Sequence, residues 1–102
     1  RQLKRILKRT GVGIARTGGY TGHGSGEVMI GFTTANRIPS GREEELLQIS
    51  AIPEHVINRA FLAAAEAEQE AILNSMTAAK QTRGREGELY YSLAEYLNDR
   101  EA

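Results

Sequence analysis

The chain has 102 residues, 13 basic and 13 acidic side chains, no cysteine and 40% hydrophobic residues. This is the size and composition of one modest globular domain, which argues against disorder over its whole length. The lack of cysteine excludes disulfide scaffolds, thiolate zinc sites and cysteine nucleophiles. No apolar run approaches the roughly 20 residues that span a bilayer. Because the net charge is zero, we expect neither nucleic acid nor membrane as a partner.

The sequence begins Arg1-Gln2-Leu3, with neither a methionine nor a signal peptide. We therefore expect this chain to be part of a longer polypeptide, whose earlier residues contribute to its function.

Residues 1–9 are predicted to form a short amphipathic helix. Leu3, Ile6 and Leu7 fall at i, i+3 and i+4 and make one apolar stripe, while basic residues cover the other faces. The basic face could bind nucleic acid or anionic lipid. No aromatic residue lies among the charges to stack on bases, so we prefer a solvated helix face above a buried stripe.

Two strands are predicted, at residues 12–17 and 27–35, with a loop over residues 18–26. In the first, Val12 and Ile14 share a face. In the second, Val28, Ile30 and Phe32 alternate with Met29, Gly31 and Thr33. The two strands suggest an antiparallel pair, but two strands alone make a marginal sheet. We infer that they complete a sheet begun elsewhere, in further residues or in a partner chain.

A turn cluster is predicted at residues 36–42. Residues 43–52 are ambiguous, and we prefer a short strand or extended segment that ends at Pro53.

The strongest helix signal runs from Pro53 to about Thr82, which would span about 45 Å if unbroken. This segment is rich in alanine and suited to lie close to a sheet or another helix. Its predicted stripe is Ile57, Ala60, Phe61, Ala64, Ala71, Ile72, Ser75 and Met76. We expect this helix to be substantially buried only when a partner chain covers it. A last short helix is predicted from Leu93 to about Arg100.

The loop before the second strand carries the chemistry. Glycines at positions 22, 24 and 26 let another segment of backbone approach closely. Ser25 and Glu27 are two residues apart, so they share one face at the start of the strand. A hydroxyl and a carboxylate there can jointly orient a nucleophile or an amine. A plain connecting loop is the simple alternative.

Two other interpretations of this loop are weak. It lacks the G-x-x-x-x-G-K-[ST] pattern, and a strand rather than a helix follows it, so a phosphate cradle is disfavoured. His23 is better explained as a loop or packing residue than as a general base. A triad of Ser25, His23 and Glu27 is implausible, because alternate residues on one short segment cannot meet head to tail.

Three segments together, residues 11–16, 22–27 and 31–36, resemble the small subunit of the self-processing serine aminopeptidases. This family comprises the L-aminopeptidase D-Ala-esterase/amidase group and the β-peptidyl aminopeptidases. The resemblance runs from Arg1 to residues 84–87 and implies an α/β fold, a four-layer αββα sandwich similar to N-terminal-nucleophile hydrolases. Residues 1–102 would supply part of one sheet and its flanking helices, as most of a small subunit in a single domain completed by a large subunit.

The resemblance also implies a function. Ser25 and Glu27 match the family's serine and acid that contact the nucleophile, a serine expected shortly before Arg1. The substrates would be peptides or amino-acid amides or esters with a free amino end, and neither a metal nor another cofactor is implied. The heterodimers would form a higher oligomer, and this chain alone would be inactive. We expect a cytoplasmic protein, with a periplasmic or secreted one left open. The alternatives are a non-catalytic structural or binding homologue of the same fold and a related acyltransferase.

Overall fold

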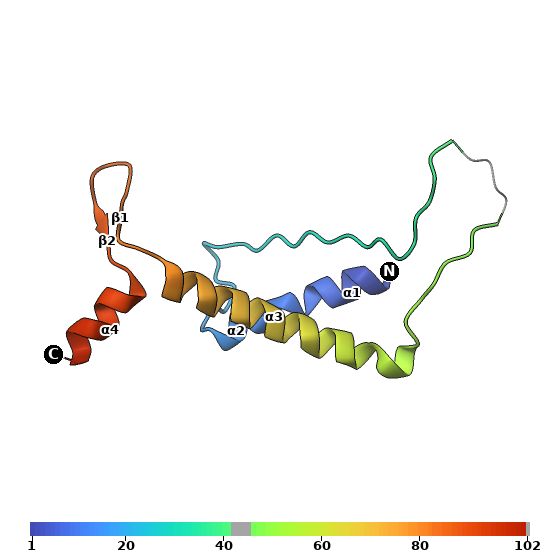
Figure 1. Ribbon diagram of the computed structural model, residues 1–102, viewed down its shortest axis with the longest axis horizontal. Coiled ribbons are helices and arrows are strands. Elements are labelled where there is room, and N and C mark those ends of the chain that lie inside the picture. The colour runs from blue at the N-terminus through green and yellow to red at the C-terminus, as the bar shows by residue number, and fades with distance from the viewer. Residues whose placement is uncertain (42–45, 102) are drawn as a thin grey trace.

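The computed structural model describes residues 1–41 and 46–101 of the chain (Figure 1). Within them the chain is rich in α-helix and has one two-stranded sheet. In chain order the elements are α1 (Gln2–Lys8), α2 (Thr10–Arg16), the 3-10 helix η1 (Glu54–Val56), α3 (Ile57–Ala78), β1 (Thr82–Arg83), β2 (Leu89–Tyr90) and α4 (Leu93–Glu101). A long irregular stretch separates α2 from η1 and carries the predicted loop and second strand.

The chain is elongated and does not close a core of its own. Its radius of gyration is 19.8 Å and its extents are 66 × 33 × 27 Å, whereas a compact domain of this length has a radius of gyration of about 13 Å. Its accessible surface is 9026 Å², against about 5,700 Å² for a compact monomer of this mass. Of the described hydrophobic residues only Ile57 and Ala65 are buried.

The prediction of a strand at residues 12–17 is wrong, because Thr10–Arg16 forms helix α2. The helical spacing that begins in α1 continues through it, with Thr10, Gly13 and Ile14 following at i+3, i+6 and i+7 from Leu7. Two glycines lower the helix propensity of this segment by about 1 kcal/mol each relative to alanine. Packing against α3 outweighs that cost, and the proposed pairing of residues 12–17 with 27–35 disappears with the strand.

Helices α2 and α3 touch backbone to backbone at Gly13. A Cβ at this position would lie 2.5 Å from the carbonyl oxygen of Ala65 and 2.9 Å from the amide nitrogen of Gln69. Gly13 is buried, and Ala65 is 3% exposed. Of the two alternatives predicted for the alanine-rich helix, a sheet or another helix, the described residues show close contact with another helix.

Charged side chains of α1 and of Arg9, the residue that follows it, contact the first turns of α3 and the 3-10 helix before it. The Arg9 guanidinium lies 4.0 Å from the centroid of the Phe61 ring, and that of Arg5 lies 5.4 Å from it. Arg5 also pairs with Glu54 of η1, Nη1 to Oε2, at 2.8 Å. This hydrogen bond from Arg5 lowers the pKa of the exposed Glu54 carboxyl.

The long helix is shorter than predicted. After Pro53 a 3-10 turn leads into α3, which ends at Ala78, because Ala79 is extended with ψ 144°. Its 22 residues span about 33 Å, and Thr82 belongs to β1. Within the predicted stripe, Ile57 is buried and Ala60, Phe61 and Ala64 are half-buried, but Ala71, Ser75 and Met76 are exposed. None of the described helices is both long and apolar enough to cross a membrane.

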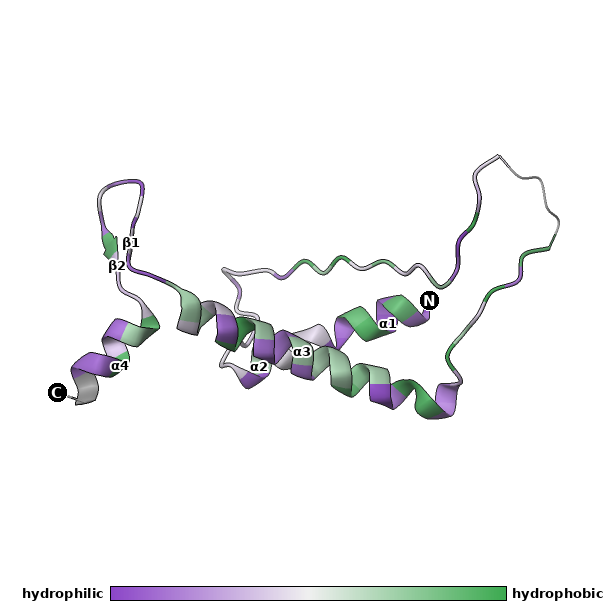
Figure 2. Ribbon diagram, viewed as in Figure 1, coloured by the Kyte–Doolittle hydropathy of each residue, from purple (hydrophilic) through white to green (hydrophobic). Residues whose placement is uncertain are grey.

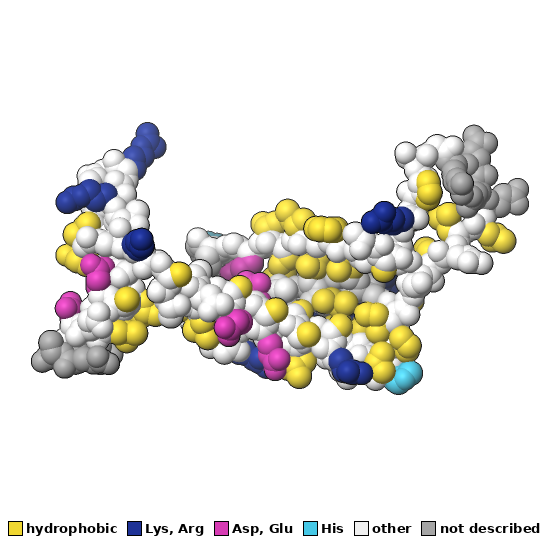
Figure 3. Space-filling view, in the orientation of Figure 1, with side chains coloured by type: hydrophobic (Ala, Val, Ile, Leu, Met, Phe, Trp, Pro, Cys, Tyr) yellow, Lys and Arg dark blue, Asp and Glu magenta, His cyan; other side chains and the backbone are white. Residues whose placement is uncertain are grey.

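Residues 27–33 run extended beside α1 and α2, yet pair with no strand among the described residues (Figure 1). One face meets the helices: a Cβ at Gly31 would lie 2.7 Å from Cδ2 of Leu7. On the other face Val28 and Ile30 are each 89% exposed and Phe32 is 86% exposed. The predicted alternation is confirmed, and the apolar row is visible along this segment in Figures 2 and 3.

The segment that leads to η1 was predicted to be extended over residues 43–52. The structure describes it from residue 46, and it is extended there; residues 42–45 lie outside the described part. Two side-chain amides bind its backbone as a neighbouring strand would. Gln2 exchanges hydrogen bonds with Ile52 at 2.6 and 2.9 Å, and Asn36 does so with Ser50 at 2.9 and 2.8 Å. These amides use one edge of the segment.

The chain ends in a hairpin and a helix that project from the body (Figure 1). The hairpin of β1 and β2, which the sequence analysis missed, pairs Thr82 with Tyr90. The predicted last helix is confirmed as α4. Ser92 and Glu95 form a capping box at its start, with the Glu95 amide donating to Ser92 Oγ at 3.2 Å and the Ser92 amide donating to Glu95 Oε2 at 2.8 Å.

The Gly13 contact predicts opposite effects for two alanine substitutions in the same helix. Gly13→Ala should lower the stability of the full-length protein by about 1–3 kcal/mol, because α2 must move off α3. Gly11→Ala should raise it by up to about 1 kcal/mol through helix propensity, since its Cβ would sit at an ordinary 3.5 Å from Cε of Met29. Chemical denaturation measures both variants, and shifts in the same direction would contradict the packing argument.

Candidate active site

The loop that follows α2 is fixed at its start by two consecutive glycines. Gly18 has φ +101°, and its amide donates to the carbonyl of Ala15 while the Gly19 amide donates to that of Ile14, both at 3.1 Å. This is the Schellman arrangement, which requires a left-handed residue just past the helix end. A Cβ at Gly19 would lie 2.6 Å from Cγ2 of Ile14. The exit direction of the loop is therefore set by α2.

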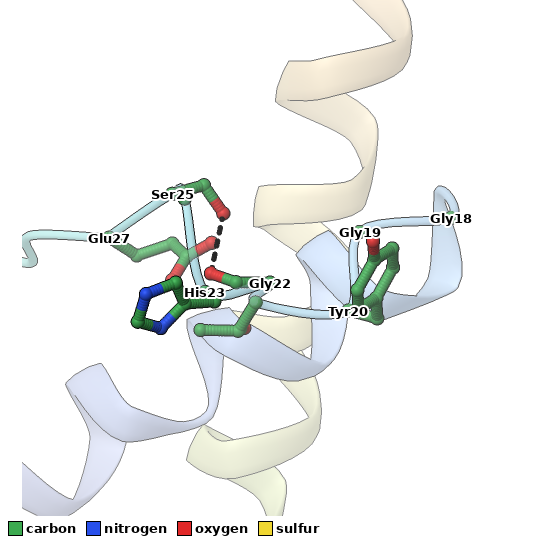
Figure 4. A pocket seen from close by; sticks show the side chains of 9 residues that line it. Gly18, Gly19, Tyr20, Gly22, His23, Ser25 and Glu27 are labelled. Carbon is green, nitrogen blue, oxygen red and sulfur yellow. Dashed lines mark hydrogen bonds between the residues drawn. The ribbon is translucent and has the colours of Figure 1, made fainter.

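The predicted loop encloses a shallow hollow of about 350 Å³ (Figure 4). It is lined by the backbone of the loop and by the side chains of Tyr20, Thr21, His23, Ser25 and Glu27. Ser25 and Glu27, which the sequence analysis singled out, thus line the same hollow. It is open to solvent, and all five of these residues are exposed.

Ser25 is held by the carbonyl of Gly22. The Ser25 amide donates to that oxygen at 3.1 Å, and its hydroxyl donates to the same oxygen at 3.3 Å, the bond drawn in Figure 4. Because the hydroxyl proton is directed at Gly22, the lone pairs of Oγ remain available. In this arrangement Ser25 can accept a hydrogen bond from an amine or a hydroxyl group.

Glu27 stands where the extended segment begins, and within the described residues its carboxylate makes no hydrogen bond or ion pair. It is therefore free to bind an amine or ammonium group. His23 lines the same hollow, but it hydrogen-bonds to neither Ser25 nor Glu27. The described residues contain no cluster of three or more His, Asp or Glu side chains that could hold a metal ion.

Comparison with known proteins identifies the class of this chain. The sequence model of peptidase family S58 matches residues 1–90, and the chain belongs to that family. The resemblance to the self-processing aminopeptidases is thereby confirmed at the level of the family, which supports a peptidase-family role.

Two curated relatives carry the name beta-peptidyl aminopeptidase BapA. The protein from Sphingosinicella microcystinivorans is 34% identical over 86 residues, which are 84% of this chain and 22% of the relative. The protein from Sphingosinicella xenopeptidilytica is 29% identical over 93 residues, 90% of this chain and 23% of the relative. The chain thus spans less than a quarter of the length of these relatives.

A solved structure has the same arrangement. The crystal structure of the PH0078 protein from Pyrococcus horikoshii OT3 superposes with a TM-score of 0.87 at 46% identity, over 98% of this chain and 28% of that chain. The elongated arrangement of these helices and extended segments is therefore shared with a longer chain.

The hollow contains one feature that the sequence analysis missed. Thr21 has φ +57°, and among the described residues it is the one non-glycine residue with a positive φ. Its residue type gives no signal for this, because a β-branched side chain disfavours the left-handed region.

Proposed function

We propose that this chain is the greater part of the small subunit of an autoprocessed serine-type aminopeptidase or amidase. The enzyme would release N-terminal residues from peptides, amides or esters. One observation carries the proposal: Ser25 and Glu27 line one solvent-open hollow at the start of the extended segment, each with hydrogen-bonding capacity to spare. Membership of a peptidase family, and the aminopeptidase names of two relatives, agree with it.

The proposed chemistry uses a nucleophile from outside residues 1–102. A serine preceding Arg1, freed by self-cleavage, would attack the substrate carbonyl with Oγ and pass its proton to its own amine. The amine or alcohol of the substrate would leave with that proton, and water would then hydrolyse the acyl-enzyme to release the acid and restore the serine hydroxyl. Ser25 and the Glu27 carboxylate would each accept a hydrogen bond from the amino group of the nucleophilic serine, which leaves the nitrogen lone pair to take the hydroxyl proton. Together they would hold the hydroxyl and the amine in register.

A large subunit of the same precursor would complete the fold as a four-layer αββα sandwich. The helices α1, α2 and α3 would form part of an outer layer, and residues 27–33 would be a strand of the adjacent sheet. The accessible surface exceeds that of a compact monomer by about 3,300 Å², an area on the scale of obligate interfaces. The exposed row of Val28, Ile30 and Phe32 would face the second sheet. The heterodimers would form a higher oligomer.

Substitutions at the two polar residues test the catalytic role. In the full-length protein, Ser25→Ala and Glu27→Ala should each reduce kcat for amino-acid p-nitroanilides by roughly 10²-fold, the usual scale for a positioned acid–base group. Ser40→Ala and Glu66→Ala are matched controls, because both residues are exposed and outside the hollow. They should retain wild-type turnover.

Near-normal turnover in both Ser25→Ala and Glu27→Ala would exclude the catalytic roles proposed for Ser25 and Glu27. If the full-length product has no turnover and its intact mass is that of a single uncleaved chain, the protein is a non-catalytic homologue. If a competing amine captures most of the acyl group in place of water, it is an acyltransferase.

Hydrogen exchange in the full-length protein tests whether residues 27–33 lie within a sheet. Amides of this segment should exchange at least about 10²-fold more slowly than those of the hairpin tip at residues 85–87, because strand pairing in a core protects amides. Exchange of residues 27–33 as fast as at the hairpin tip would contradict a completed sheet.

A further inference from the structure

Thr21 occupies a backbone conformation that its side chain opposes. Its φ of +57° lies in the left-handed region, where Cβ crowds the following carbonyl oxygen and where a β-branched residue is a genuine outlier. Such residues cluster at functional sites, where the surrounding structure holds them. Thr21 lines the same hollow as Ser25 and Glu27.

Nothing local offsets this cost. Asparagine and aspartate can adopt the left-handed conformation with help from a side-chain hydrogen bond. Among the described residues the Thr21 hydroxyl has no hydrogen-bond partner. The side chain itself therefore gives no reason for the conformation, and the reason must be sought in what the backbone does next.

The next residue is Gly22, whose carbonyl accepts both hydrogen bonds that hold Ser25. The φ of Thr21 sets the direction in which the chain enters this turn. A change to the ordinary region near −60° would rotate the following peptide by more than about 100°. The Gly22 carbonyl and the Ser25 hydroxyl would then be directed elsewhere.

We propose that Thr21 is a positioning residue for the reaction described under Proposed function, on which this inference rests. Its left-handed backbone holds the Gly22 carbonyl so that it takes the Ser25 hydroxyl proton. Ser25 then presents its lone pairs, rather than its proton, to the nucleophile. Thr21 acts through Gly22 and Ser25 and contributes its backbone angle rather than its hydroxyl group.

A substitution series in the full-length protein tests this. If the backbone angle matters, kcat should follow each residue's tolerance of positive φ. The kcat of Thr21→Asn should lie between the wild-type value and about three times that value. The kcat of Thr21→Val should stay within about threefold of wild type. Thr21→Pro, which fixes φ near −65°, should lose at least about tenfold, since small misplacements of catalytic groups are costly. KM should change less than kcat.

The pH profile separates positioning from a loss of stability. In Thr21→Pro the acidic limb of kcat/KM, which reports the nucleophile's amine, should move. Gly87→Pro is the control: φ at Gly87 is +86° and its amide donates to the Gly84 carbonyl, so proline there weakens the hairpin, which does not line the hollow. That variant should lower Tm without moving the limb.

Three results would overturn the proposal. The first is a wild-type kcat and pH profile in Thr21→Pro. The second is a loss of kcat in Thr21→Asn as large as that in Thr21→Pro. The third, which decides if Thr21→Pro does not fold, is a lower kcat in Thr21→Asn than in Thr21→Val. When Ser25→Ala abolishes turnover but the Thr21 series is flat, only the role of Thr21 fails. When Ser25→Ala and Glu27→Ala are both active, the proposed function fails first.

Discussion

The contact between Gly13 and Ala65 determines where the rest of the described chain can lie. It brings the backbones of α2 and α3 within a few ångströms of each other, and any side chain at position 13 would push them apart. Through α2 the contact fixes the Schellman turn at Gly18 and hence the direction of the loop with Ser25 and Glu27. A helix–helix contact thus sets the geometry of a hollow several residues further along the chain, without any side chain of α3 lining it.

The sequence predicted the elements whose signal is local. The apolar stripe of α1, the alanines of α3 and the start of α4 at Leu93 were all evident from spacing and propensity. Helix α2 was missed because its two glycines argue for a strand or loop when its partner helix is not in view. The hairpin of β1 and β2 was missed because its strands are only two residues each. The positive φ of Thr21 could not be predicted, since no residue preference favours it.

The predicted site depends on a different kind of information. Alternation alone placed Ser25 and Glu27 on one side of the chain, and the structure brings both to the same hollow. The contact of Ser25 with the Gly22 carbonyl needed the three-dimensional turn, because it depends on backbone angles and not on residue type. That contact decides whether the hydroxyl acts as donor or acceptor. Spacing therefore predicted that the two residues lie together, and the backbone turn directs the Ser25 hydroxyl.

Four glycines of the loop, Gly18, Gly19, Gly24 and Gly26, divide into two kinds by what surrounds them. Gly18 is required by its positive φ, and Gly19 by the nearness of Ile14. Gly24 and Gly26 have neither a positive φ nor an atom within 4 Å of an added Cβ. Alanine would cost less conformational entropy at both positions, so this chain alone gives no reason for glycine there. These two flank Ser25, on the stretch where the proposed nucleophile and its strand would have to approach the backbone closely. Glycine on both sides of Ser25 would suit the neighbour from outside residues 1–102 that is proposed above, and so would the uncovered row of Val28, Ile30 and Phe32.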